Sequence, residues 1–136
     1  MLKIYSDAAV SAKEHLAGAG LIIVGDGLHQ QLAIPLPSTE DNHLAELEAF
    51  YHAVNWPIEQ GRTEEWTVFH TDSQLVERAV RKNHMKNSRY ADVFRSIMAS
   101  LDELSFYEVK WIPEKDNRGA DNLAKQALAK QRKSRK

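Results

Sequence analysis

Four acidic residues in well-separated stretches of the chain are candidates for one shared chemical role: Asp7, Glu46, Asp72 and Asp121. Carboxylates that converge on one point repel each other unless a cation neutralises them. Oxygen ligands in a chain without cysteine select Mg²⁺ or Mn²⁺ rather than zinc or an iron–sulfur cluster. Two such ions about 4 Å apart would activate water and stabilise the departing oxygen in phosphodiester cleavage.

Glu46 is the most informative of the four, because helical periodicity places it on an apolar face. In the helix predicted over 40–58, a rotation of about 100° per residue puts Glu48 in a narrow polar arc. Glu46 falls about 150° from the centre of that arc, among apolar side chains. A buried carboxylate must be neutral, paired with a cation or bound to metal. Alternatively, Glu46 lies at a solvent-exposed helix end or pairs with a Lys or Arg.

Asp7 and Asp72 each follow an apolar or aromatic run, at the ends of strands predicted over 2–7 and 65–71. If these strands are parallel neighbours, both carboxylates lie at the carboxyl edge of the sheet, where open α/β sheets bind ligands. Each residue also has a structural interpretation, because Asp72 could cap the following helix and Asp7 could occupy a turn. The chemical interpretation therefore depends on whether the two side chains meet Glu46.

Asp121 occupies the first turn of a helix predicted over 117–130, at the border of its buried stripe. The helix dipole favours a carboxylate at that position, which is sufficient as a structural explanation. Considered with the other three acids, Asp121 becomes a candidate for a fourth metal ligand.

Alternating and helical patterns predict the elements that would position these acids. Strands are predicted over 2–7, 17–24, 28–34, 65–71 and 105–112, and helices over 40–58, 73–82, 88–102 and 117–130. Gly25-Asp26-Gly27 indicates a hairpin turn, and Pro35 favours an edge position for the third strand. Ser38 and Thr39 are the predicted caps of the first helix. A hairpin-rich start followed by β/α alternation predicts an α/β fold, a mixed sheet with helices on both faces.

Composition predicts one domain over residues 1–129, followed by a basic tail over 130–136. The 136 residues include 43% hydrophobic and 27% charged residues, which is typical of a globular protein. The tail holds five of the 18 basic residues, leaving 13 basic against 19 acidic residues in the domain. The tail could be a solubilising end or a tether to nucleic acid. The absence of cysteine, of a signal peptide and of an apolar run of about 20 residues predicts a cytoplasmic protein without a membrane segment.

Five segments, in order along nearly the whole chain, resemble motifs of type 1 ribonuclease H. They are IYSDAA at 4–9, AGLII at 19–23, NHLAELEA at 42–49, HTDSQLV at 70–76 and NRGADNLA at 117–124. The resemblance is to the short bacterial and archaeal reverse-transcriptase-like branch, without the long basic insertion that grips the hybrid. It implies a five-stranded mixed sheet in the order 3-2-1-4-5, with the second strand antiparallel to the others.

The resemblance also implies an activity, which is hydrolysis of the RNA strand of RNA/DNA hybrids with two Mg²⁺ or Mn²⁺ ions. By motif position, the four acids match the family's metal ligands. Asn42 and Gln74 match residues that contact the minor groove of the hybrid, where shape and 2′-hydroxyls are recognised rather than sequence. The neighbouring residues His43 and Ser73 are further candidates for substrate binding. We expect the hybrid as partner, no organic cofactor and a monomer.

Three departures from the family pattern concern activity more than fold. Ala8 replaces a glycine after the first Asp, His43 replaces an asparagine, and Glu114 stands where the short branch has an arginine. Glu114 would repel phosphate, although Lys115 or Arg118 could supply the missing positive charge. One alternative is therefore a catalytically weak or inactive nucleic-acid-binding module on the same fold. Another is a nuclease that acts on double-stranded RNA or branched DNA.

Overall fold

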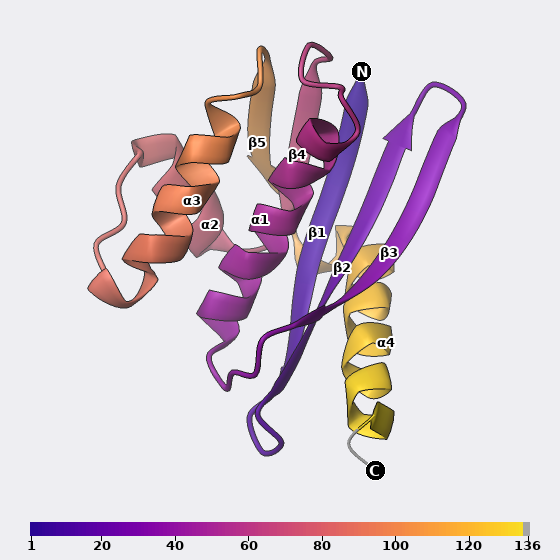
Figure 1. Cartoon of the computed structure of the whole chain (residues 1–136), viewed down its shortest axis with the longest axis vertical. Helices are drawn as coiled ribbons and strands as arrows, with labels where there is room; N and C mark the ends of the chain where they lie inside the picture. Colours follow the sequence, from indigo (N-terminus) through magenta and orange to yellow (C-terminus); the bar gives the residue numbers. More distant parts are fainter. Residues whose placement is uncertain (135–136) are drawn as a thin grey trace.

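The computed structural model describes residues 1–134 and contains one five-stranded sheet, in the order β3-β2-β1-β4-β5 (Figure 1). The strands are β1 (Leu2–Ser11), β2 (Leu16–Gly25), β3 (Leu28–Leu36), β4 (Thr67–Thr71) and β5 (Tyr107–Trp111). β2 runs antiparallel to β1 and β3, whereas β4 pairs in parallel with both β1 and β5. The predicted strand order and directions are therefore confirmed.

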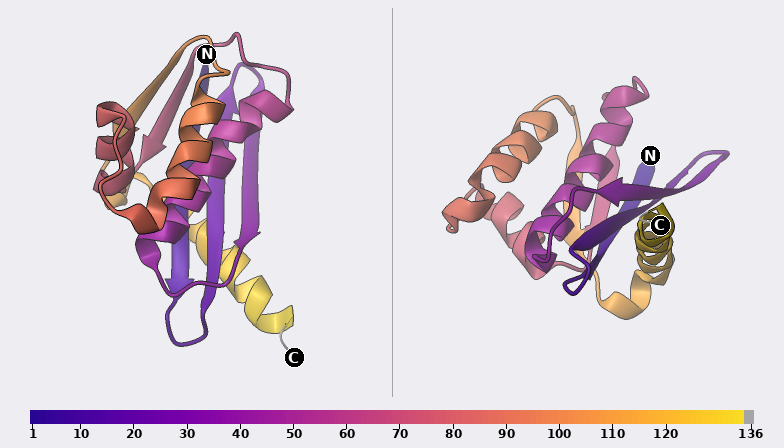
Figure 2. Two further views of the ribbon diagram at one scale, coloured as in Figure 1. Left: turned by 60° about the vertical axis from the view of Figure 1, so that its left-hand side comes forward. Right: turned by 60° about the horizontal axis from the view of Figure 1, so that its bottom comes forward.

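Helices cover both faces of this sheet, as the element pattern predicts. They are α1 (Asn42–Glu59), α2 (Gln74–Lys82), α3 (Ala91–Leu101) and α4 (Arg118–Ser134), with short 3₁₀ turns at Ser88–Tyr90 and Glu114–Asp116. Figure 2 shows α1, α2 and α3 on one side of the sheet and α4 on the other. Within residues 1–134, no helix is long and apolar enough to cross a membrane.

The main core lies between the sheet and the helices α1, α2 and α3. Leu2 and Ile4 of β1 are fully buried, as the alternation of that strand predicts. Phe50 of α1 meets Phe69 of β4 edge to face, with ring centroids 5.6 Å apart. These contacts pack α1 against β1 and β4.

The β1 strand continues to Ser11, four residues beyond its predicted end. Its parallel pairing with β4 nevertheless stops at Ser6 opposite Thr71, while its antiparallel pairing with β2 continues. Asp7 thus lies in the middle of a strand but directly beyond the last β1–β4 pair. The turn interpretation of Asp7 is wrong, and the predicted position at the carboxyl edge of β4 is confirmed.

The N-cap of α1 is Asp41, not Ser38 or Thr39. Its carboxylate accepts hydrogen bonds from the backbone N–H groups of His43 (3.0 Å) and Leu44 (3.2 Å). It also accepts from the Tyr90 hydroxyl at 2.8 Å and from the Arg89 guanidinium at 3.2 Å. A tertiary contact therefore adds to the local preference for Asp at a cap and determines which residue begins the helix.

The last helix, α4, extends to Ser134 rather than to residue 130, so the expected domain boundary after residue 129 falls inside it. The Gln131 amide donates to the carbonyl oxygens of Ala17 and Leu36. Arg132 forms an ion pair with Glu14, with Nε 2.8 Å from Oε1. Gln131 and Arg132 of the predicted basic tail therefore contact the rest of the domain, and residues 135 and 136 lie outside the described part of the chain.

Close packing of α4 on β2 depends on two glycines, Gly18 and Gly20. A Cβ atom added to Gly20 would overlap the Ala120 carbonyl oxygen and lie 2.6 Å from the backbone nitrogen of Ala124. In the strand register, Gly20 is also the partner of Asp7. The missing side chain thus lets the first turn of α4, with Asp121, approach Asp7.

We expect Gly20→Ala to lower the free energy of unfolding by about 3 kcal/mol or more, because backbone atoms of α4 cannot move aside as a flexible side chain can. Urea unfolding followed by circular dichroism measures this change. Gly25→Ala is the matched control, since the nearest atom to its new Cβ is the flexible end of Leu2 at 3.1 Å. Equal losses in the two variants would contradict the close-packing argument.

Candidate active site

A cavity of about 440 Å³ opens where β4 ends beside β1. The residues that line it come from β1, the first turns of α1, α2 and α4, and the loop after β5. They are Asp7, Ala8, Asn42, His43, Glu46, Asp72, Ser73, Gln74, Leu75, Glu114, Asp121 and Lys125. The cavity therefore collects side chains from segments far apart in the sequence, at the sheet edge where α/β proteins bind ligands.

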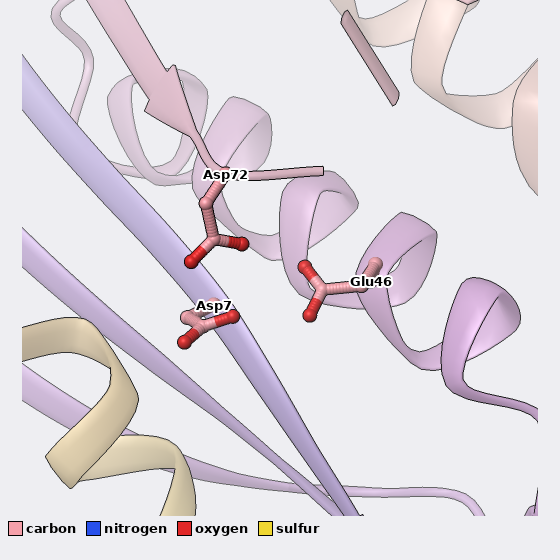
Figure 3. Close-up of side chains that lie close together, drawn as sticks. All are labelled: Asp7, Glu46 and Asp72. Atoms are coloured by element: carbon pink, nitrogen blue, oxygen red, sulfur yellow. The ribbon is translucent and has the colours of Figure 1, made fainter. Parts of the chain in front are cut away.

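Three of the four predicted acids converge in this cavity. Asp7, Glu46 and Asp72 each offer a carboxylate oxygen, and these oxygens lie within 4.8 Å of one another. Figure 3 shows the three carboxylates facing a common point, from β1, from α1 and from the residue after β4. Asp7 and Glu46 are each only 6% exposed, so little water is available to screen their charges.

The main chain of β1 orients two of these carboxylates. The Ala8 N–H donates to Asp7 Oδ1 at 2.9 Å and to Glu46 Oε1 at 3.2 Å. The other oxygen of Glu46, Oε2, is buried and has no hydrogen-bond partner among the described residues. A buried carboxylate oxygen without a partner is costly. The interpretation that Glu46 lies in solvent or pairs with a Lys or Arg is wrong.

Asp72 does not cap a helix; its carboxylate is instead held by an asparagine side chain. Ser73 caps α2, since its Oγ accepts from the Val76 N–H at 3.2 Å, so the cap interpretation of Asp72 is wrong. Asn117 Nδ2 donates to Asp72 Oδ2 at 3.3 Å and to the Ser6 carbonyl at 2.9 Å. Asn117 thereby links the end of β4 to β1 at the level of the acids.

Burial raises the pKa values of all three acids, and neighbouring negative charges add to the effect. Burial, reinforced by the charge of Asp72, raises the pKa of Asp7 to about 7. Burial and then the charge of Asp7 raise the pKa of Glu46 to about 10. The pKa of Asp72 is raised chiefly by burial, against the hydrogen bond from Asn117, which lowers it. The cluster without a cation thus retains protons that exposed carboxylates would lose at neutral pH.

These residues fit a divalent cation. All the converging atoms are carboxylate oxygens, which are the ligands that Mg²⁺ and Mn²⁺ prefer. A cation would supply the missing partner of Glu46 Oε2, and its charge would offset the burial and the repulsion that raise the three pKa values.

Asp121 lines the same cavity but is not one of the three converging acids. Its Oδ2 lies 2.9 Å from Lys125 Nζ, one helical turn further along α4. Lys125 also lines the cavity and was not among the residues predicted from the sequence. The spacing of four residues between Asp121 and Lys125 is the signal that could have indicated this ion pair.

The predicted substrate-binding residues divide into two groups. Asn42, His43, Ser73 and Gln74 line the cavity, around the first turns of α1 and α2. Lys115 and Arg118 are exposed and do not line it, whereas Glu114 does. Neither basic residue therefore compensates for Glu114 inside the cavity. The positive charge that lines the cavity comes instead from Lys125.

A family model described as "Reverse transcriptase-like" matches residues 5–127. The chain belongs to this reverse-transcriptase-like family. An Enterococcus faecalis relative in the comparison, "Putative hydrolase EbsB", is 32% identical over 130 residues, which are 96% of each protein. Membership of the reverse-transcriptase-like family confirms the resemblance to type 1 ribonuclease H at the level of the family.

Solved ribonuclease H structures share the fold of this family member at low identity. Ribonuclease H1 of the archaeon Halobacterium salinarum superposes with a TM-score of 0.83 at 23% identity, covering 95% of this chain and 98% of the other. LC11-RNase H1 in complex with an RNA/DNA hybrid gives 0.83 at 22% identity, with 96% and 98% covered. The N-terminal RNase H domain of rv2228c from Mycobacterium tuberculosis gives 0.80 at 18% identity, with 99% and 98% covered. The chain has the ribonuclease H fold.

Proposed function

We propose that this protein is a metal-dependent endonuclease that hydrolyses the RNA strand of RNA/DNA hybrids, with two Mg²⁺ or Mn²⁺ ions in the substrate complex. It is a hydrolase of the ribonuclease H type. The observation that carries the proposal is the set of three carboxylates within 4.8 Å of one another, with one buried oxygen of Glu46 left without a partner. Family membership and the name of the Enterococcus faecalis relative support it.

Asp7, Glu46 and Asp72 would hold the metal ions, and Asp121 would complete the set from the wall of the cavity. Bound divalent ions supply activation of water and stabilisation of the departing oxygen. The Ala8 N–H orients the carboxylates of Asp7 and Glu46, and Asn117 orients that of Asp72. The chain thus contributes a preorganised set of acidic ligands and no side-chain nucleophile.

The residues around the first turns of α1 and α2 would bind the hybrid. Asn42, His43 and Gln74 line the cavity next to the acids, where they can contact the minor groove. The contacts of Asp41 with Tyr90 and Arg89 tie the start of α1 to the connector between α2 and α3. This connection keeps Asn42 and His43 at a fixed position relative to the metal ligands.

Lys125 would compete with a metal ion for Asp121, because its ammonium group already lies 2.9 Å from that carboxylate. We expect Lys125→Met to tighten Mn²⁺ binding about threefold, the modest effect of removing one exposed ion pair. Calorimetric titration of the metal-free protein with Mn²⁺ measures it. Lys130→Met is the control, since Lys130 lies on the same helix but outside this cavity. Unchanged or weaker binding in Lys125→Met would contradict the competition.

Cleavage of an end-labelled RNA/DNA hybrid, with Mg²⁺ and with Mn²⁺ in turn, tests the proposed function. Double-stranded RNA and branched DNA of the same sequence serve as competing substrates. We expect cleavage of the RNA strand of the hybrid in at least one metal. Faster cleavage of either alternative substrate, or no cleavage of any, would overturn the assignment of the hybrid.

A second candidate function is a hybrid-binding module with little catalytic activity. Glu114 favours it, because a carboxylate in the cavity wall repels both phosphate and a departing oxyanion. Hybrid binding without cleavage in either metal would select this alternative. Recovery of cleavage in Glu114→Arg would identify Glu114 as the cause.

A further inference from the structure

The strand β5 ends the sheet, and no further strand lies beyond it among residues 1–134. All of its residues are exposed except Val109, which is partly buried. The large hydrophobic side chains that the described chain exposes gather on or beside this strand, apart from Met1: Trp66, Phe106, Tyr107 and Trp111. An exposed, apolar edge strand offers its backbone for pairing with another chain.

The free backbone groups of β5 belong to alternate residues. Phe106 accepts a hydrogen bond from the Thr67 N–H at 3.1 Å, and Ile112 donates to the Thr71 carbonyl at 2.9 Å. Both bonds point toward β4, and the direction of backbone groups alternates along a strand. The N–H and C=O groups of residues 107, 109 and 111 therefore point away from the sheet.

A second copy of β5 can pair with these groups in one favourable antiparallel register, centred on Val109. In that register Tyr107 lies opposite the partner's Trp111, and Val109 lies opposite the partner's Val109. Each of these is a hydrogen-bonded pair, as the outward groups require. Glu108 then lies opposite the partner's Lys110 in the non-hydrogen-bonded pairs, where side chains approach most closely.

The charges of Glu108 and Lys110 favour this register over the registers shifted by two residues. A shift by two residues in one direction places Glu108 opposite the partner's Glu108. A shift in the other direction places Lys110 opposite the partner's Lys110. Like charges directly opposite each other are destabilising, whereas the centred register forms two ion pairs of opposite charge. A shift by one residue would bring groups already bonded to β4 to face the partner.

We propose that this protein forms a homodimer by antiparallel pairing of β5 from two copies, which joins their sheets into one. The proposal replaces the monomer expected from the sequence. Charged residues on an edge strand usually discourage such pairing. Here the order Tyr107-Glu108-Val109-Lys110-Trp111 makes the strand complementary to itself in charge and in aromatic contact.

Sedimentation velocity over about 1 to 100 µM protein tests the dimer, since micromolar affinity corresponds to about 8 kcal/mol of association free energy. We expect concentration-dependent dimerisation of the unaltered chain. Lys110→Glu should weaken it by about tenfold or more, because both ion pairs become like-charge pairs. Glu108→Lys should weaken it similarly. An equimolar mixture of the two variants should form heterodimers, in which every facing pair again has opposite charge.

Lys3→Glu is the matched control, because it makes the same charge change on an exposed β1 residue away from this edge. It should leave dimerisation unchanged. The double variant Glu108→Lys with Lys110→Glu reverses both charges and should dimerise like the unaltered chain. A protein that stays monomeric at the highest concentration overturns the proposal. A dimer that is insensitive to Lys110→Glu, or variants that fail to associate when mixed, overturns it equally.

Discussion

Asp72→Asn should reduce hybrid cleavage by at least about a thousandfold while the protein remains folded. The substitution removes one negative charge from a group of three carboxylates whose oxygens lie within 4.8 Å of one another. A neutral amide oxygen is a much weaker ligand for a divalent cation than a carboxylate oxygen. The loss should therefore appear in Mg²⁺ and in Mn²⁺ alike.

The fold should tolerate this change because the amide oxygen can still accept the hydrogen bond that Asn117 donates to Asp72 Oδ2. Initial rates on an end-labelled hybrid, together with the thermal midpoint of each protein, measure both effects. Asp92→Asn provides the matched control, since the Asp92 side chain is 97% exposed on α3 and does not line the cavity. Undiminished cleavage by Asp72→Asn would remove Asp72 from the catalytic set.

The stability of the metal-free protein should fall as the pH rises from 7 to 9. Burial raises the pKa of Glu46 to about 10 in the folded state, whereas an unfolded glutamate titrates near 4.5. Between these values the folded state retains a proton that the unfolded state has lost, so each unit of pH costs about 1 kcal/mol of unfolding free energy. The stabilising contribution is complete below about pH 4 and disappears as the pH passes the folded pKa.

The window from pH 7 to 9 lies between the pKa of Asp7, about 7, and that of Glu46, about 10. His52 and His70 have pKa values lowered by burial, so they are neutral in both states above pH 7. Asp7, with a pKa of about 7, has lost most of its contribution by pH 8. We expect Glu46 to contribute most of the slope that remains, because its pKa of about 10 lies above this window.

Urea unfolding in the presence of a chelator, at several pH values, measures this slope. Glu46→Gln should abolish it, because the amide does not titrate, and should make the metal-free protein more stable at pH 9. Saturating Mn²⁺ should also flatten the slope in the unaltered chain, since the ion takes over neutralisation of the carboxylates. A slope that is the same in Glu46→Gln and in the unaltered chain would show that another group causes it.

Local patterns were sufficient for the order of elements and for the most important acid. Alternation identified β1, and the rotation of about 100° per residue placed Glu46 on the buried face of α1. Both signals depend on residues a few positions apart. They predict the structure correctly because the strand and helix faces that these patterns make apolar are the faces that pack in the core. The boundaries were less predictable. The N-cap of α1 is Asp41 rather than the predicted Ser38 or Thr39. Tyr90 and Arg89, almost fifty residues away, also bind the Asp41 carboxylate.

Lys125 and Asn117 show why parts of the candidate site were missed. Lys125 is one of many lysines in the sequence, and its importance comes from the cavity that its helix borders. The sequence predicts Asn117 only as the first residue of the last helix, whereas in the structure its amide bridges Ser6 and Asp72. The spacing of four residues could indicate the pair of Lys125 with Asp121, but no local pattern reports the cavity beside Lys125 or the bonds of Asn117 to β1 and to the end of β4.

The amino-acid sequence alone determined the family, the strand order that the family implies and the four acids. Only the tertiary structure decided that Asp7, Glu46 and Asp72 converge, and that Asp121 instead pairs with Lys125. It also decided that β5 keeps an open edge. The physical reason is that side-chain type and periodicity are local properties of the chain. Distances between residues tens of positions apart depend on how helices and strands pack, and here on the glycines that let α4 approach β2.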